Sequence, residues 1–223
     1  MARRPSGRLA AVVLGGLVGL TAVVAALGED ETAPEPPEDE APQLFLDAWA
    51  RSQAATFRSV AQFTRTSNST DAQLRGEVIT AQRPPEELRI DRTGARGLVD
   101  GRRIICTFRD EELACQDAEA QVTYEEEAAD QLDALRSYVV GDVPLYTVDA
   151  ELGTDRGDCF ELGLAREMVS PPLGVVARYC FDEELGAPTF VRVEQVEAID
   201  EAVTVSLEAE VTDEDLDPAT ALD

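Results

Sequence analysis

Short segments with strand periodicity, separated by turn residues, run through most of the chain after residue 58 and constrain its fold more than any other feature. Asp100-Gly101 lies between two apolar runs and predicts a tight hairpin turn. From Val203 to Glu210 apolar and polar residues alternate, which predicts that one face of the last strand is buried and the other is solvated. We expect antiparallel strands over residues 59–65, 74–82, 87–91, 95–99, 102–108, 113–116, 145–151, 159–164, 177–182, 189–196 and 202–211.

Two segments have helical periodicity instead. Residues 43–58 place Trp49 and other apolar residues on one side, which predicts an amphipathic helix. A second helix is predicted over residues 123–138, because Thr123 followed by Glu126 matches a capping box. Two helices among these antiparallel strands predict an α+β fold, in which a single curved sheet forms a half-barrel wrapped around helices on its concave side.

An uninterrupted apolar run, residues 9–27, follows an arginine-containing stub at residues 1–8. Its 19 residues come close to the length needed to span the roughly 30 Å hydrocarbon core of a bilayer. We therefore expect residues 9–28 to be a single-pass anchor in the cell membrane, with the stub cytoplasmic and the C-terminal domain outside. Small residues near Ala26 also fit signal-peptide cleavage, so a secreted protein without residues 1–28 stays an open alternative.

Residues 29–42 contain four prolines and seven acids, a composition typical of a linker that cannot bury a core. We expect residues 43–212 to form one extracytoplasmic domain, followed by a solvated acidic tail at residues 213–223. Asp213, Asp215 and Asp217 resemble half of a calcium-binding loop, but Pro218 occupies the position that requires glycine. The sequence therefore predicts no metal site in the tail.

Four cysteines fall into two local pairs, and each pair flanks a predicted hairpin. We predict disulfides between Cys106 and Cys115 and between Cys159 and Cys180, as suits an exported domain. A zinc site is disfavoured by the spacing and because the chain has no histidine. We expect no metal and no cofactor.

Charge and composition narrow the functions further. All 19 basic residues are arginine, and 45 acids give a net charge of −26, which is unfavourable for binding nucleic acid. Without histidine or lysine the chain cannot build Ser-His-Asp, Cys-His or Ser-Lys catalytic groups, and its cysteines are better used in disulfides. We therefore expect a binding protein and not an enzyme.

The order of several motifs resembles the LolA-like lipoprotein-carrier superfamily, which includes mycobacterial lipoprotein lipid carriers and sensor domains of sigma-factor regulators. The resemblance covers most of residues 43–212. The motifs are Thr56-Phe57-Arg58-Ser59, Gly76-Glu77-Val78, Arg83-Pro84-Pro85-Glu86-Glu87-Leu88-Arg89, Leu98-Val99-Asp100-Gly101 and the segment 180–188 followed by residues 191–196. The chain departs from the family in having no lipobox cysteine and in having two predicted disulfides.

The resemblance implies an apolar cavity between the sheet and the helices that holds a lipid or acyl chain. The apolar residues that we expect to line it are Trp49, Phe63, Leu74, Val78, Leu88, Ile90, Ile105, Phe160 and Phe190. A core role for each of them is the competing interpretation. The two functions that remain are a membrane-tethered lipid or lipoprotein carrier or sensor, and a regulatory domain that binds a protein partner. The sequence leaves the ligand and the oligomeric state open.

Overall fold

The computed structural model describes residues 40–109 and 112–221. The stub, the apolar run, most of the linker, residues 110–111 and the last two residues lie outside this part, so the predictions about them stay predictions. No helix within the described ranges is long and apolar enough to cross a membrane.

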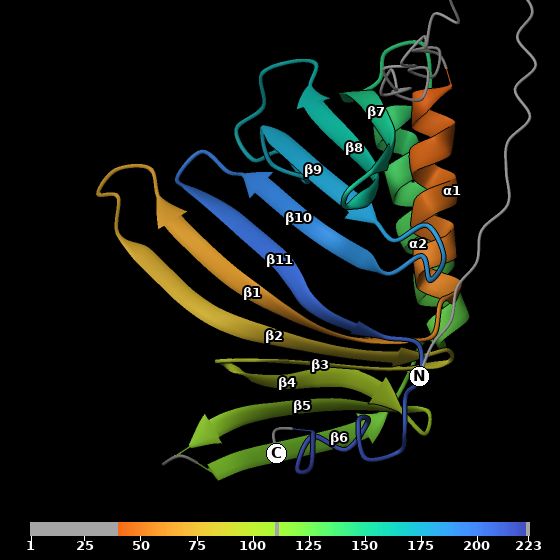
Figure 1. Cartoon of the computed structure of the whole chain (residues 1–223), viewed down its shortest axis with the longest axis vertical. Coiled ribbons are helices and arrows are strands. Elements are labelled where there is room, and N and C mark those ends of the chain that lie inside the picture. Colours follow the sequence, from red (N-terminus) through yellow and green to blue (C-terminus); the bar gives the residue numbers. More distant parts are fainter. Residues whose placement is uncertain (1–39, 110–111, 222–223) are drawn as a thin grey trace, which may run out of the picture. The chain divides into compact units, whose positions relative to one another are not determined.

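Eleven antiparallel strands form a single sheet in the order β6-β5-β4-β3-β2-β1-β11-β10-β9-β8-β7 (Figure 1). The helices are α1 (Ala41–Ala54) and α2 (Tyr124–Val139). The strands are β1 (Phe57–Ser67), β2 (Gln73–Arg83), β3 (Glu86–Asp91), β4 (Gly94–Val99), β5 (Arg102–Arg109), β6 (Glu112–Glu119), β7 (Tyr146–Thr154), β8 (Gly157–Leu164), β9 (Val176–Phe181), β10 (Pro188–Glu194) and β11 (Ala198–Glu208). The sheet curves around the helices, which confirms the predicted α+β half-barrel, and each of the eleven expected ranges forms a strand.

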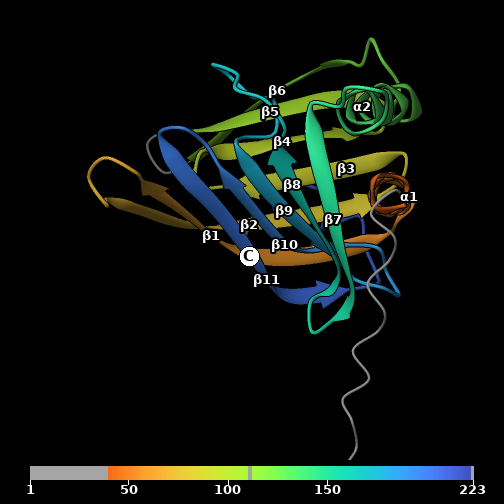
Figure 2. The same ribbon diagram turned by 90° about the horizontal axis from the view of Figure 1, so that it is seen from above.

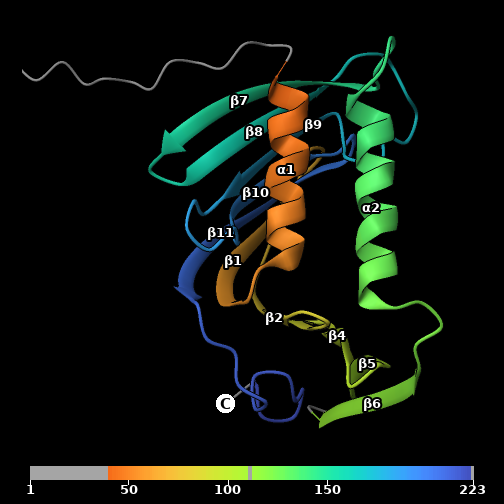
Figure 3. The ribbon, with the colours of Figure 1, turned by 90° about the vertical axis from the view of Figure 1, so that its right-hand side faces the viewer.

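The chain follows two meanders joined by one long crossing. Strands β1 to β6 run outward to one edge of the sheet, and α2 then carries the chain to β7 at the other edge. Strands β7 to β11 return to the centre, where β11 pairs with β1. The crossing helix α2 packs against α1 on the concave side of the sheet, and Figures 2 and 3 show the two helices side by side there.

Local signals at turns and caps explain where the elements begin and end. Thr123 accepts a hydrogen bond from the Glu126 backbone N–H while the Glu126 side chain accepts one from the Thr123 N–H, which confirms the capping box. Asp100 and Gly101 both have positive φ, as a two-residue hairpin turn between β4 and β5 requires. The first helix is shorter than predicted, because buried Phe57 already belongs to β1.

Both disulfides are confirmed. Cys106 and Cys115 are bonded across the β5–β6 hairpin, and Cys159 and Cys180 are bonded across β8 and β9. Each pair lies directly opposite in the strand register, so local hairpin geometry brings the two sulfurs together.

The last strand departs from simple alternation. A β-bulge at Val205 interrupts the pairing of β11 with β1, so that Leu207 lies opposite Ser59 while Thr204 lies opposite Ala61. Val205 is consequently exposed, and Val203 and Leu207 point to different faces. The predicted single buried face of this strand is therefore wrong, because one extra residue reverses the alternation beyond it.

Two hydrophobic cores lie on opposite faces of the sheet. On the concave face, α1 and α2 pack on β7 to β9, and Phe45, Phe160 and Leu162 are completely or almost completely buried there. On the convex face, Leu88 and Ile90 of β3 pack with Leu216 from the chain after β11. Residues 211–221 thus fold back under β2 to β5 (Figure 3), and the expected solvated tail is corrected to a packed segment.

Two aspartates fix this C-terminal segment. Asp215 contacts Arg58 at 2.9 Å, and Asp213 contacts Arg83 at 2.9 Å. Two of the three acids that resembled a calcium loop therefore make ion pairs with arginines of β1 and β2.

Candidate functional site

A pocket of about 300 Å³ lies between the two helices and the concave face of the sheet. Its apolar wall consists of Trp49, Ala128, Tyr179, Phe181, Pro188 and Val191. The opposite wall is polar and comes from the ends of both helices together with β2 and β3. The volume is at the lower end of the roughly 300–1,000 Å³ that small-molecule sites occupy. A pocket with one apolar and one polar wall suits an amphiphilic ligand.

Trp49 is the central residue of the apolar wall. Its ring packs edge-on against Tyr179 at 5.4 Å and Phe181 at 6.2 Å between ring centroids, which fixes its orientation. Its indole Nε1 is buried and finds no hydrogen-bond partner among the described residues. Burying such a donor unpaired costs roughly 1–3 kcal/mol.

Hydrogen bonds hold the two helix ends that frame the pocket. The Gln82 amide on β2 donates to the carbonyl oxygens of Ser52 at 2.6 Å and Ala55 at 2.9 Å. The Tyr124 hydroxyl donates to the Gln53 carbonyl oxygen at 2.6 Å. Carbonyl groups at the end of α1, which the helix itself cannot pair, are thereby satisfied by the sheet and by α2. The pocket is consequently built on fixed elements.

Charged groups cluster on the polar wall. Burial, and then repulsion from Glu127, raise the pKa of Glu87 above its usual range, against the opposing attraction of Arg103, Arg89 and Arg96. Burial, and then the negative charge of Glu87, raise the pKa of Tyr124 to about 12, so its hydroxyl remains a donor at neutral pH. Arg89 lies on the pocket wall and keeps access to solvent.

The nine residues expected to line a cavity do not share one. Trp49 alone among them lines this pocket, whereas Phe160 is buried in the core beneath α1. Phe63 and Val78 lie on the concave face of β1 and β2. The other five are Leu88 and Ile90, in the convex core, Phe190, beside the Cys159–Cys180 disulfide, and Leu74 and Ile105, which are exposed. Contact of any of them with a ligand stays a prediction.

The polar wall was missed from the sequence. Glu87 and Arg89 alternate with apolar Leu88 and Ile90 along β3, so the sequence shows that one face of this strand is polar. We assigned the apolar pair to the cavity because cavities for acyl chains are mostly apolar. In the structure, Leu88 and Ile90 pack in the convex core with Leu216. Glu87 and Arg89 face the helices and line the pocket.

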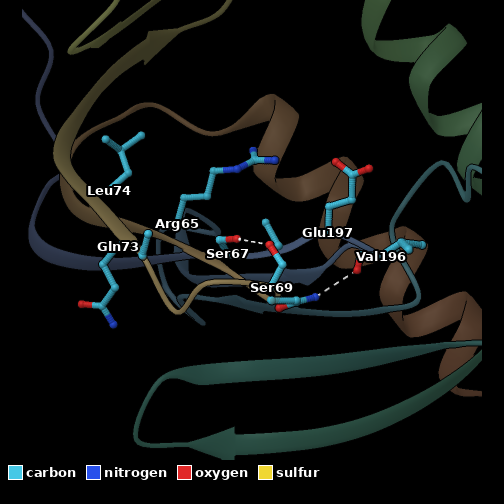
Figure 4. A pocket seen from close by; sticks show the side chains of 10 residues that line it. Arg65, Ser67, Ser69, Gln73, Leu74, Val196 and Glu197 are labelled. Atoms are coloured by element: carbon cyan, nitrogen blue, oxygen red, sulfur yellow. Dashed lines mark hydrogen bonds between the residues drawn. The ribbon is translucent and has the colours of Figure 1, made fainter.

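A second hollow, of about 860 Å³, lies between the β1–β2 and β10–β11 turns (Figure 4). Its polar groups pair with each other: the Asn68 amide donates to the carbonyl oxygens of Gln195 and Val196, and the Ser67 and Ser69 hydroxyls are 3.1 Å apart. It is formed by the ends of two hairpins and lacks aromatic residues. We therefore centre the candidate site on the pocket beside Trp49.

No protein-family model matches the chain, and no curated protein matches it. Solved structures that match include members of the family that the sequence resembles. A LolA superfamily protein from Nitrosomonas europaea is 8% identical, with 79% of this chain and 97% of that one covered and a TM-score of 0.33. LprF from Mycobacterium bovis is 9% identical, with 83% and 100% covered and a TM-score of 0.40. A chain of the MucA/MucB complex from Pseudomonas aeruginosa is 14% identical, with 78% and 59% covered and a TM-score of 0.40.

Proposed function

We propose that the protein is a non-catalytic, extracytoplasmic carrier or sensor, tethered to the cell membrane through residues 9–27, that holds part of a lipid or lipoprotein in the pocket beside Trp49. The observation that carries this proposal is the pocket itself, which combines a fixed aromatic wall with a polar wall. The aromatic wall suits the apolar chain of such a ligand, and the polar wall suits the part near its headgroup.

The volume of the pocket limits how much of a ligand it encloses. At about 300 Å³ it holds one short chain or part of a longer one, and the remainder would extend over the concave face. The polar wall would then contact the part of the ligand near its headgroup.

Native mass spectrometry of the full chain, purified from its own host in neutral detergent, tests the proposal. We expect a stoichiometric adduct that organic extraction removes, and a Trp49→Ala variant that retains less of it. Ala54→Ser, an exposed change at the end of α1, is the control and should retain the adduct. A chain that carries no adduct and takes up none from host lipid extract would contradict the proposal.

A second candidate, a regulatory domain that binds a protein partner, is favoured by a different observation. Two adjoining loops expose apolar side chains: Val143 is 69% exposed and Val169 is 98% exposed. The loops contact each other, because the Arg166 guanidinium donates to the Val143 carbonyl oxygen. Contiguous exposed apolar residues are typical of protein-binding surfaces.

Photocrosslinking from position 169 of the full chain in its host separates the two candidates. One discrete protein adduct would support the regulatory domain. Adducts with lipid alone, or none, would exclude a protein partner at these loops.

A further inference from the structure

We infer that Arg89, on the polar wall of the pocket, and Arg96, opposite it on β4, form an anion-binding site for the negatively charged headgroup of the bound amphiphile. This inference rests on the proposed function and deepens it, because it gives the ligand a chemical class. The class is a single-chain or multi-chain lipid with a carboxylate or phosphate group close to its apolar part.

The two arginines face each other across neighbouring strands. Arg89 of β3 lies directly opposite Arg96 of β4 in the antiparallel register, on the face that carries Glu87 and the pocket. Like charges directly opposite in a sheet are destabilising. Desolvation by the surrounding protein, and then the positive charge of Arg96, lower the pKa of Arg89, against the opposing attraction of Asp91 and Glu87. A bound anion would remove this repulsion.

Neither arginine has a carboxylate oxygen within 4.0 Å among the described residues, although acids far outnumber arginines in the chain. Nine other arginines of the described part do make such pairs, whereas Arg75, Arg92, Arg156 and Arg166 do not. Arg89 and Arg96 differ from those four in lying directly opposite each other on neighbouring strands. In a protein with a net charge of −26, two adjacent unpaired guanidinium groups beside a pocket mark a local site for an anion.

The carboxylates that face this site are mostly engaged elsewhere. Glu127 of α2 pairs with Arg103 at 2.5 Å, and Asp91 accepts hydrogen bonds from the backbone N–H and the hydroxyl of Thr93. Glu87 remains, with a pKa raised mainly by burial, so its negative charge is the one most easily neutralised there. The arginines therefore keep donors available for a ligand.

The distance between the charged and apolar parts of the site is short, because Arg89 itself lines the pocket with Trp49. An amphiphile could place its headgroup between the strands β3 and β4 and its chain against Trp49, Tyr179 and Phe181. Guanidinium groups bind carboxylate and phosphate through paired N–H donors, which suits either headgroup.

The fluorescence of Trp49 gives a direct test, because it is the single tryptophan of the chain. The full chain is held in nanodiscs of zwitterionic lipid and titrated with dodecyl phosphate, with dodecanol and with inorganic phosphate. We expect dodecyl phosphate to bind more tightly than dodecanol, and Arg89→Gln and Arg96→Gln each to weaken dodecyl phosphate about tenfold while leaving dodecanol unchanged. Arg75→Gln is the matched control, since Arg75 is exposed on the other face of the sheet and should change neither affinity.

The outcomes separate this inference from the proposed function. Equal binding of dodecyl phosphate and dodecanol, unaffected by the arginine variants, would overturn the anion site and leave the pocket as a lipid site. If inorganic phosphate binds as tightly as dodecyl phosphate, the ligand of this site is a free anion and not an amphiphile, and the inference is overturned. Failure of both amphiphiles to alter Trp49 fluorescence would overturn the proposed function itself.

Discussion

The two halves of the sheet bury opposite faces. Strands β7 to β9 bury their concave face under α1 and α2, whereas β2 to β5 bury their convex face under residues 211–221. The concave face of β3 is therefore left polar, and the pocket lies where the two arrangements meet: Tyr179 and Phe181 belong to one half, Glu87 and Arg89 to the other. A single curved sheet can thus combine a packed half with a ligand-facing half, provided that a separate segment covers its outside.

The largest effect is expected in the helix-covered half. Phe160→Ala should lower the free energy of unfolding by about 3–5 kcal/mol, because the ring is completely surrounded beneath α1. Denaturant titration followed by circular dichroism measures the loss. Phe108→Ala, at a side chain that is 39% exposed on β5, is the control and should cost much less. Equal losses would contradict the assignment of the main core to the helix-covered half.

The disulfide in the helix-covered half should also contribute more to the free energy of unfolding than the disulfide in the other half. Replacing Cys159 and Cys180 together by serine should cost about 3 kcal/mol, and replacing Cys106 and Cys115 somewhat less, because loop-closure entropy grows with the length of the closed loop. The loops span 21 and 9 residues of sequence separation. Denaturant unfolding of the two double variants under oxidising conditions tests this order. A larger loss of unfolding free energy on removing the Cys106–Cys115 disulfide would contradict it.

The C-terminal segment should stabilise the other half without influencing the pocket. Leu216→Ala should cost about 2 kcal/mol, at the low end for a buried leucine because a terminal segment can relax around the change. The Trp49 emission spectrum of the folded variant should stay unchanged. A shifted spectrum would show that the convex core and the pocket are coupled, and an unchanged stability would show that residues 211–221 do not cover this face.

The smallest effect concerns Glu87. Because its pKa is raised in the folded state, folding favours the protonated form, and the carboxylate destabilises the domain above that raised pKa. Glu87→Gln should therefore stabilise the protein at neutral pH. The gain should decrease as the pH falls through the raised pKa and vanish below the ordinary value of 4.5. Denaturant midpoints of variant and parent across this range measure it, and a gain that grows toward acid pH would reverse the sign we assign.

Local patterns predicted much of the fold, but not the side of the sheet that each strand buries. The capping box at Thr123, the Asp100-Gly101 turn and the disulfide between Cys159 and Cys180 depend on neighbouring residues or on a single hairpin, and all were predicted. The assignment of Leu88 to a cavity failed to anticipate its contact with Leu216, which lies far along the chain. Alternation shows that a strand has one apolar face, and only the tertiary contacts decide what covers it.

The same limit applies to the candidate site. Trp49 was identified because an aromatic residue on an amphipathic helix faces the sheet. Arg89 and Arg96 were not identified from the sequence, because an arginine in an alternating strand is typical of a solvated face. That the two side chains lie opposite each other depends on the register of β3 with β4. Charge composition pointed only away from nucleic acid, and the local arrangement alone distinguishes these two arginines from the rest.

Photolabelling with a fatty acid that carries a diazirine near the end of its chain tests the central claim most directly. The labelled full chain is digested and the modified residues are identified by mass spectrometry. The account predicts labels on the concave wall, at Trp49, Ala128 or Val191, with labelling reduced by unlabelled fatty acid. Labels confined to the exposed loops at Val143 and Val169, with none in the pocket, would contradict it.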